Sequence, residues 1–397
     1  MNKKTIRDID IANKRILVRV DFNVPLDEQC QITDDARIVA ALPTIEYLLN
    51  NGARVILMSH LGRPDGQMVE KLRLTPVAQR LSNLLHTTVQ TVPDCIGPQV
   101  EVAVTALQPS QVLLLENLRF HKEEEKNNPE FARQLASLGE IYVNDAFGTA
   151  HRAHASTEGV THYLPSVAGF LIEKEINFLG SALEHPRRPF VAVVAGAKVS
   201  DKIKVLERLL SIADAILIGG GMANTFLKAQ GYEIGDSLYE EARIDVAHDL
   251  IKKAQQQNKP FLLPTDVVIA DRFAADAERK VVAANQVTPG WRILDLGSQT
   301  VQHFRSVLDD AQTILWNGSL GVAEMPAFAV ATNELIAILS DRTQNGAITI
   351  VGGGDSAAAV DKAGAADRMT HVSTGGGASL EFLEGRILPG VAALEDK

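Results

Sequence analysis

The chain has 397 residues, of which 46% are hydrophobic and 5% aromatic, and its formal net charge is −10 at pH 7. This length exceeds one ordinary hydrophobic core and predicts two domains of a soluble protein, while the acidic charge argues against general nucleic-acid binding. The two cysteines suit neither a disulfide framework nor a zinc cluster and favour a reducing compartment, and no apolar run fits a membrane span or a secretory signal.

Short β-branched runs alternate with segments of helical period along the whole chain. In the first half we expect strands at 15–20, 55–59, 112–116 and 141–144, with helices at 38–49 and 131–138. In the second half we expect strands at 190–195, 215–218, 261–263, 313–316 and 347–351. Nearly continuous apolar strands separated by helices predict an α/β fold with parallel sheets covered on both faces. Ligands bind such sheets at the carboxyl ends of the strands.

The boundary between the two domains is expected near residues 172–189. A segment of helical period at 172–183 is followed by Pro186 and Pro189, which bracket two arginines. This pattern predicts a stiff link, and a surface loop within one large domain is the alternative.

Basic side chains follow the strands of the first half. Arg37 stands at an expected helix start, where the macrodipole disfavours a cation unless an anion docks there or Asp34 pairs with it. Guanidinium groups bind phosphate oxygens two at a time, so the set predicts an anion site. Its members are Arg37, His60, Arg63, Arg119, Arg152 and the pair His151 and His154, for which no third metal ligand is evident.

Two polar residues after the first strand complete this half. Asp21 and Asn23 point to the same side of an extended segment, where they could hold hydroxyls or a carboxylate. A turn stabilised by their own side-chain hydrogen bonds is the alternative.

The second half carries glycine runs at strand-to-helix junctions, at 196–202, 219–221, 352–356 and 373–378. Lys198 and Lys202 are expected to share one helix face near its N-terminus, which is favourable when an anion binds there. Asp355 either caps a helix or holds a nucleotide-associated Mg²⁺. Together the runs predict a nucleotide-binding surface, although neither a Walker A loop nor a G-x-G-x-x-G loop is present.

These motifs resemble phosphoglycerate kinase over essentially the whole chain. The matching segments are 19–25, 59–64, 117–120, 150–154, 196–202, 219–224, 352–355 and 373–377. The resemblance implies two Rossmann-like, doubly wound parallel-sheet lobes joined by a hinge helix. It also implies a cytoplasmic, monomeric enzyme of glycolysis and gluconeogenesis. The implied domains are a phosphoglycerate-binding lobe at 1–172, a hinge helix and linker at 173–189, a nucleotide-binding lobe at 190–387, and a tail at about 388–397 that packs back on the first lobe.

The resemblance also implies site residues. Asp21 and Asn23 would hold the hydroxyl and carboxyl end of the glycerate. The basic residues would bind the triose, most of them through its non-transferred phosphate, and Arg37 would also face the carboxyl-phosphate end. The implied substrate set is Asp21, Phe22, Asn23, Arg37, His60, Leu61, Gly62, Arg63, Arg119 and Arg152. The implied nucleotide set is Gly196, Lys198, Lys202, Gly219, Gly220, Gly297 at the purine, Glu324 at the ribose, Gly352, Gly353, Gly354, Asp355 and Ser356. Arg37, Lys198 and Lys202 would be catalytic, and Asp355 would associate with Mg²⁺.

The implied reaction moves a phosphoryl group in line between 1,3-bisphosphoglycerate and ADP, giving 3-phosphoglycerate and ATP after hinge closure. It needs alignment and charge neutralisation rather than a general base. A non-catalytic nucleotide- or metabolite-binding descendant and a dinucleotide-dependent dehydrogenase are the alternatives. The chain departs from the family pattern at Ser298, Ser319, Leu320 and Ala323, which bears on nucleotide affinity and closure.

Overall fold

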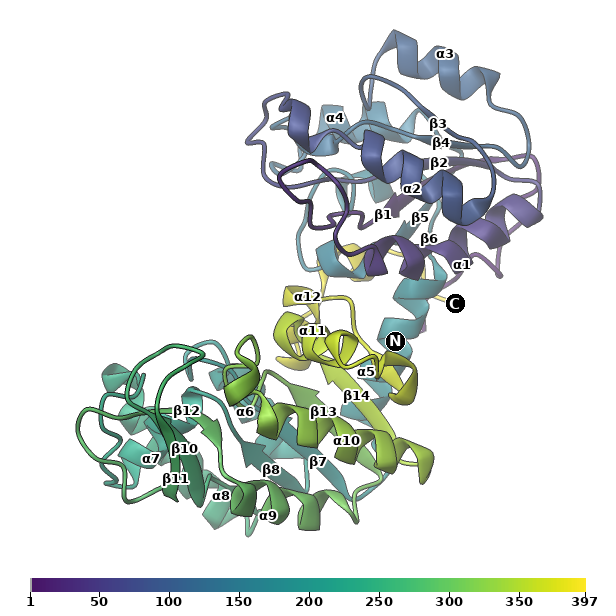
Figure 1. The fold of residues 1–397 in the computed structure, drawn as a ribbon. Helices are drawn as coiled ribbons and strands as arrows, with labels where there is room; N and C mark the ends of the chain where they lie inside the picture. Colours follow the sequence, from purple (N-terminus) through teal and green to yellow (C-terminus); the bar gives the residue numbers. More distant parts are fainter. Residues whose placement is uncertain (1) are drawn as a thin grey trace. The chain divides into compact units, whose positions relative to one another are not determined.

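The computed structural model describes residues 2–397, which divide into two compact units (Figure 1). Unit 1 consists of residues 2–177 together with 387–397, and unit 2 consists of residues 178–386. Within the described residues, no helix combines the length and the apolar character needed to cross a bilayer.

Unit 1 is built on a six-stranded sheet in the order β3-β4-β2-β1-β5-β6, with every neighbouring pair parallel. The order places β1 between β2 and β5, so β1 is hydrogen-bonded to a neighbouring strand along both of its edges. The strands are β1 Arg15–Val20, β2 Arg54–Met58, β3 Val89–Thr91, β4 Val112–Leu114, β5 Ile141–Asp145 and β6 Ser166–Ala168. The helices are α1 Ala36–Asn50, α2 Thr75–Leu85, α3 Pro98–Ala106, α4 Pro129–Ala136 and α13 Pro389–Ala392.

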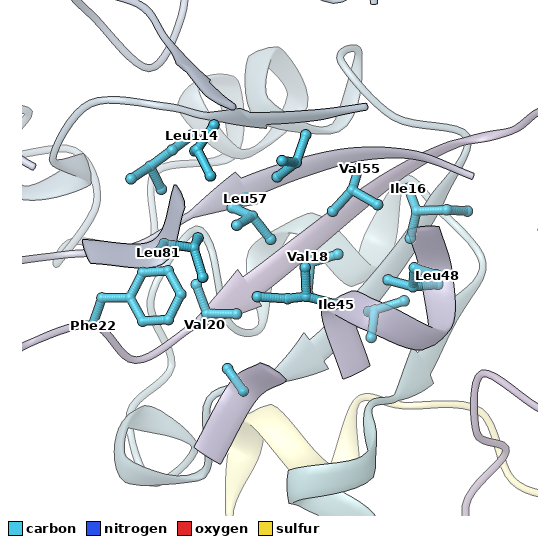
Figure 2. Close-up of a cluster of buried hydrophobic side chains, with 14 of the residues drawn as sticks. Ile16, Val18, Val20, Phe22, Ile45, Leu48, Val55, Leu57, Leu81 and Leu114 are labelled. Carbon is cyan, nitrogen blue, oxygen red and sulfur yellow. The ribbon is translucent and has the colours of Figure 1, made fainter. Parts of the chain in front are cut away.

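One face of this sheet forms the hydrophobic core of unit 1. Ile16, Val18 and Val20 alternate along β1 toward the side where Ile45 of α1 and Leu81 of α2 lie (Figure 2). All five side chains are fully buried. The intervening residue of β1, Arg19, is therefore directed to the other face, because successive strand residues alternate sides.

Unit 2 repeats the plan with a parallel sheet in the order β15-β14-β13-β7-β8-β9. The strands are β7 Phe190–Val194, β8 Ala215–Ile218, β9 Phe261–Leu262, β13 Thr313–Asn317, β14 Ile348–Gly352 and β15 His371–Val372. The helices are α6 Ile203–Ile212, α7 Met222–Ala229, α8 Ile244–Gln256, α9 Ser298–Leu308, α10 Val330–Gln344, α11 Gly354–Lys362 and α12 Gly377–Leu383. The predicted α/β fold with two doubly wound parallel sheets is confirmed.

A third sheet in unit 2 was not anticipated by the strand pattern. It is antiparallel, with the order β11-β10-β12, from β10 Asp266–Ala270, β11 Arg279–Ala283 and β12 Arg292–Leu296. The edge strand β11 is largely exposed, so it lacks the continuous apolar run that marks a buried parallel strand.

Helix α5, Phe170–Glu184, contains the division between the units and covers the segment where the sequence predicts a helix over 172–183. Its first turn is held by Asp145, at the end of β5, which accepts a hydrogen bond of 2.8 Å from the Leu171 amide. Burial raises the pKa of the Asp145 carboxyl to about 7.

The two ends of the described chain meet in unit 1. The Lys4 amide donates to the Glu395 carbonyl at 2.8 Å, and the Lys397 amide donates to the Asn2 carbonyl at 3.0 Å. Farther back, the Asn144 side chain of β5 donates to the Gly390 carbonyl at 2.8 Å. Residues 387–397 are therefore hydrogen-bonded into the same unit as the N-terminal segment.

Replacing Leu57 by Ala tests how much of unit 1's stability lies in the core of Figure 2. Leu57 is fully buried in β2, so Leu57→Ala should lower the free energy of unfolding by about 2–5 kcal/mol. Urea unfolding followed by circular dichroism measures this. Val102→Ala is the control, because Val102 is 71% exposed and its loss should change stability by less than about 0.5 kcal/mol. Equal effects from the two changes would contradict the core assignment.

Candidate functional sites at the ends of the central strands

Each parallel sheet reverses its winding beside a central strand. In unit 1 the chain proceeds from β1 to β2 on one side and resumes at β5 on the other, so the reversal lies between β1 and β5. In unit 2 it lies between β7 and β13 for the same reason. Loops diverge at such a point and leave a crevice at the carboxyl ends of the strands, where open α/β sheets bind ligands.

In unit 1, three segments meet at the reversal point. Asp21 directly follows β1, Arg37 lies in the first turn of α1, and Gly148 follows β5. The Arg37 guanidinium donates to the Asp21 carboxylate, which is 7% exposed. A Cβ atom at Gly148 would overlap that carboxylate, so the position has no room for a side chain. The alternative partner of Arg37, Asp34, instead accepts from the Ala36 amide at 2.9 Å.

His60 lies beside Arg19, on the face of the sheet opposite the core of Figure 2. Arginine only donates, so the 3.1 Å contact between Arg19 Nη2 and His60 Nδ1 leaves the imidazole proton on Nε2. Burial first, and then the charges of Arg19, Arg119 and Arg37, lower the pKa of His60 well below 6.5. His60 is therefore a neutral hydrogen-bond donor. Its Nδ1 is already in use as an acceptor.

The arginines of unit 1 lie close enough together to shift the pKa values of their neighbours. Burial lowers the pKa of Arg119, with Arg19 and Arg152 adding to the effect, and Glu125 pairs with it at 3.2 Å. Burial, together with these same arginines, lowers the pKa of His154 to about 3. The two histidines thus add no positive charge at neutral pH.

The main buried counter-charge to Arg19 is Glu124. Its side chain is fully buried and accepts hydrogen bonds from the hydroxyl and the amide of Ser156, whose hydroxyl also accepts a hydrogen bond of 2.8 Å from Arg19. Burial raises the pKa of Glu124, while Arg19 opposes that shift. The buried acids here, Asp21 and Glu124, are outnumbered by the surrounding arginines, so the local field favours an anionic ligand.

The loop after β2 is held by amide side chains. Asn23 accepts from the Gly62 amide at 2.8 Å, and Arg119 donates to the Gly62 carbonyl at 2.9 Å. Asn117 donates to the Leu61 carbonyl at 2.8 Å. Asn23 is therefore a structural partner of this loop.

The remaining residues of the expected substrate set differ in their exposure to solvent. The side chains of Phe22 and Leu61 are buried, and Phe22 belongs to the hydrophobic core in Figure 2. Arg63 and Arg152 are exposed, and Arg152 Nε lies 3.1 Å from His151 Nε2. Sequence reasoning missed Arg19 and Gly148. A charged residue between two buried valines in the interior of β1 was the available signal for Arg19.

In unit 2, glycines let three loop backbones approach one another at the reversal point. Gly318, with φ of +92°, follows β13, and a Cβ there would overlap the Ala195 carbonyl. Gly220, with φ of +68°, follows β8, and its Cβ would stand 2.6 Å from the Gly196 backbone. Only glycine satisfies both the positive φ and the lack of space.

Lys198 and Lys202 do not share a helix face, so that prediction was wrong. Helix α6 begins at Ile203, and both lysines lie in the turn that follows Gly196, where φ is +125°. The glycine extends the turn and delays the helix. Lys198 is exposed, whereas Lys202 is partly buried and donates to the Asn317 side chain. Burial lowers the pKa of Lys202, and the Asp355 carboxylate opposes this.

A cavity of about 490 Å³ lies beside these loops, entirely within unit 2. This volume is within the range of small-molecule sites. Its lining includes Gly196, Gly220, Leu296, Val322, Glu324 and Asp355. Gly297 instead forms the N-cap of α9, where a Cβ would overlap the Asp266 carboxylate, so its neighbour Leu296 provides the wall.

The first residue of the glycine run after β14 is hydrogen-bonded within unit 2, whereas the residues that follow are open to solvent. The Gly352 carbonyl accepts from Asn317 Nδ2 at 2.8 Å and from the buried Ser356 hydroxyl at 2.6 Å. Gly354 has open space where a side chain would be, and Asp355 is exposed in the first turn of α11. Because the N-cap of α11 is Gly353, Asp355 is not its cap and stays available to a ligand.

Asp295 of β12 is a cavity residue that sequence reasoning missed. Its buried carboxylate accepts from the Leu296 amide at 2.9 Å and from the Ala331 amide, at the start of α10, at 3.1 Å. A Cβ at Gly321 would overlap it, so it also touches the loop that carries Glu324. Burial raises the pKa of Asp295 to about 7.

Of the four residues that depart from the expected family pattern, Ser319 and Leu320 line the same cavity, whereas Ser298 begins α9 and lines a separate pocket. Leu320 is buried, lines the cavity, and donates through its amide to the Thr332 hydroxyl at 3.1 Å. Ser319 also lines it. Val322 and Glu324 line the wall on either side of Ala323.

Comparisons with known proteins agree on one family. The family model described as phosphoglycerate kinase matches residues 6–386. Phosphoglycerate kinases of Chloroflexus aggregans and Moorella thermoacetica are each 60% identical, over 100% of both chains. Among solved structures, phosphoglycerate kinase from Coxiella burnetii matches with a TM-score of 0.89 at 44% identity, and that from Pyrococcus horikoshii with 0.84 at 33%, each covering 98% of both chains.

Asp295→Asn tests the buried carboxyl of the cavity. Its raised pKa means that the folded state holds the proton more tightly than the unfolded state does. Between about pH 4 and pH 7 this group should therefore lower the free energy of unfolding by up to about 1.4 kcal/mol per pH unit as pH rises.

Urea unfolding of wild type and Asp295→Asn across this range should show that the variant lacks this part of the slope. If Asp295→Asn also loses a hydrogen bond, its free energy of unfolding shifts by the same amount at every pH. The slope of that free energy against pH can then still be compared with wild type. The exposed Asp309→Asn is the control and should run parallel to wild type. Parallel curves for Asp295→Asn as well would mean that Asp295 is ionised throughout.

Proposed function

The chain belongs to the phosphoglycerate kinase family, and on that premise we propose that unit 1 binds the phosphoglycerate and unit 2 the nucleotide. The protein is a phosphotransferase of glycolysis that acts on a carboxyl group. It transfers a phosphoryl group between 1,3-bisphosphoglycerate and ADP, and nothing in the comparisons supports a non-catalytic descendant. A cytoplasmic location and a monomeric state are part of the same proposal.

The observation that carries the division of roles is the different equipment of the two reversal points. Unit 1 presents arginines and neutral histidines around Asp21 and Arg37, which suits a small phosphorylated acid. Unit 2 presents glycine backbones, two lysines and a cavity of nucleotide size. Arg37 would bind the triose near its reacting carboxyl, and Arg119 and Arg152 its phosphate. Arg63, exposed on the loop after His60, belongs to the same proposed set.

For the nucleotide, the glycine backbones would let phosphates come close, and Glu324 would hold the ribose. Lys198, exposed beside the cavity residue Ala197, would meet the phosphoryl group, while Lys202 would hold the loop through Asn317 and add its charge. Asp355 fits Mg²⁺, because it is an exposed carboxylate on the cavity wall and Mg²⁺ prefers oxygen ligands. Bound with the nucleotide, Mg²⁺ would supply neutralisation of phosphate charge.

The reaction needs no general base. The carboxylate released from an acyl phosphate requires no proton, and the attacking phosphate oxygen of ADP has none to lose. His60 agrees with this, because its Nδ1 accepts from Arg19 and its Nε2 carries the proton. The chain's task is therefore alignment and charge neutralisation by Arg37, Lys198 and the loop amides. Ligands held on separate units must be brought together by hinge closure, which also excludes water.

Lys198→Ala tests the proposed contact with the phosphoryl group. Because an exposed lysine adds little to the core, the variant should fold normally and lose about 10²–10³-fold in kcat. The assay follows turnover of 3-phosphoglycerate with MgATP, coupled to reduction of the acyl phosphate by a dehydrogenase. Lys204→Ala removes an exposed lysine of α6 and should keep full turnover. A fully active Lys198→Ala enzyme would exclude the role given to this lysine.

Gly148→Ala tests the triose site without removing any charge. The added methyl group would displace the Asp21 carboxylate and release Arg37, so KM for 3-phosphoglycerate should rise on the order of tenfold. KM for ATP should stay near its wild-type value. The unchanged KM for ATP is the internal control, because Gly148 belongs to unit 1 and the proposed nucleotide cavity to unit 2. An unchanged KM for 3-phosphoglycerate would place the triose elsewhere.

A further inference from the structure

Three metal-ligating side chains meet in unit 1 outside both proposed substrate sites. Asp94 and Cys95 lie in the loop between β3 and α3, and His121 follows the short helical turn Leu118–Phe120. One ligand atom from each side chain lies within 4.8 Å of the others. His121 Nε2 is 2.7 Å from Asp94 Oδ1. The three donors are thus an oxygen, a sulfur and a nitrogen from two separate segments.

We propose that Asp94, Cys95 and His121 form a site for a thiophilic divalent cation of the Zn²⁺ class, with water as the fourth ligand. Thiolate, imidazole and carboxylate are the donors that Zn²⁺ uses, and its tetrahedral sites keep such ligands about 3.3–3.8 Å apart. The triangle therefore needs only small side-chain movements to close on an ion. Asp94 and His121 are 43% and 26% exposed at the side chain, which leaves solvent access for the water.

The charge balance of the cluster favours a cation. Cys95 is fully buried, and the Asp94 carboxylate, paired with His121 Nε2 at 2.7 Å, lies beside it. Binding of one M²⁺ releases the thiol proton and any proton on His121, and leaves a neutral set of one carboxylate, one thiolate and one imidazole around the ion.

The surroundings already orient the donors. The Cys95 amide donates to Asp94 Oδ1 at 2.7 Å, and the amide of Glu116, two residues beyond β4, donates to the Asp94 carbonyl at 3.3 Å. The His121 ring packs against Phe131 of α4, with centroids 5.2 Å apart. The simpler interpretation is an Asp–His pair beside an inert buried thiol, and it predicts no metal affinity beyond that of the rest of the surface.

Cobalt(II) distinguishes the two interpretations, because a cobalt–thiolate bond gives a near-ultraviolet charge-transfer band that oxygen ligands do not give. The full-length protein, free of nucleotide, is titrated with CoCl₂ and then with ZnCl₂. We expect the thiolate band to saturate at one equivalent and to disappear as Zn²⁺ displaces Co²⁺. A folded wild-type protein that develops no thiolate band overturns the proposal.

The second cysteine provides the matched control. Cys30 lies outside the cluster, so Cys30→Ala should keep the band, while Cys95→Ala and His121→Ala should lose it. A band that follows Cys30 instead also overturns the proposal. His121→Ala changes a partly exposed side chain, so it keeps the test decisive if Cys95→Ala fails to fold. ZnCl₂ should raise the Tm of wild type and of Cys30→Ala but leave that of His121→Ala unchanged.

Discussion

Both sites depend on one constraint, the parallel pairing of a central strand with neighbours on either side. β1 pairs in register with β2 and β5, and β7 pairs with β8 and β13. This pairing brings residues from distant parts of the chain together at the carboxyl ends of the central strands of each sheet. In unit 1 it places Asp21 beside Gly148, and in unit 2 it places Lys202 beside Asn317. The chemistry is then decided by which side chains follow the strands.

The proposed phosphate sites of the two units differ in the groups that they present. Unit 1 buries charge, so Arg19 is tied to Ser156 and to a histidine that is kept neutral by its surroundings. Unit 2 relies on backbone amides and removes side chains at Gly220 and Gly318, where loops would otherwise collide. A buried arginine that has lost water gains more from a docked anion than an exposed one does. On the proposed assignment, the first unit offers a compact anion site, and the second offers a cavity of about 490 Å³ to a larger ligand.

The sequence indicates candidate site residues where a strand ends in unusual residues. His60 and the glycine runs were found because apolar strands directly precede them, and the parallel sheets place such ends together. Contacts between side chains that are distant in the sequence could not be predicted. Nothing in the sequence pairs Arg19 with His60, and no spacing rule brings Cys95 to His121. Helical periodicity also failed locally at Lys198, because it cannot show where a glycine turn gives way to a helix.

Unit 1 is discontinuous, since residues 178–386 lie between its two parts. Two hydrogen bonds join these parts. The bond from Lys4 to Glu395 links residues nearly four hundred positions apart, and the bond from Asn144 to Gly390 links residues about two hundred and fifty positions apart. During synthesis these partners cannot meet until the last segment has left the ribosome. Unit 2, made from one continuous stretch, is available to fold earlier. The unit that begins first on the ribosome is therefore the one that is completed last.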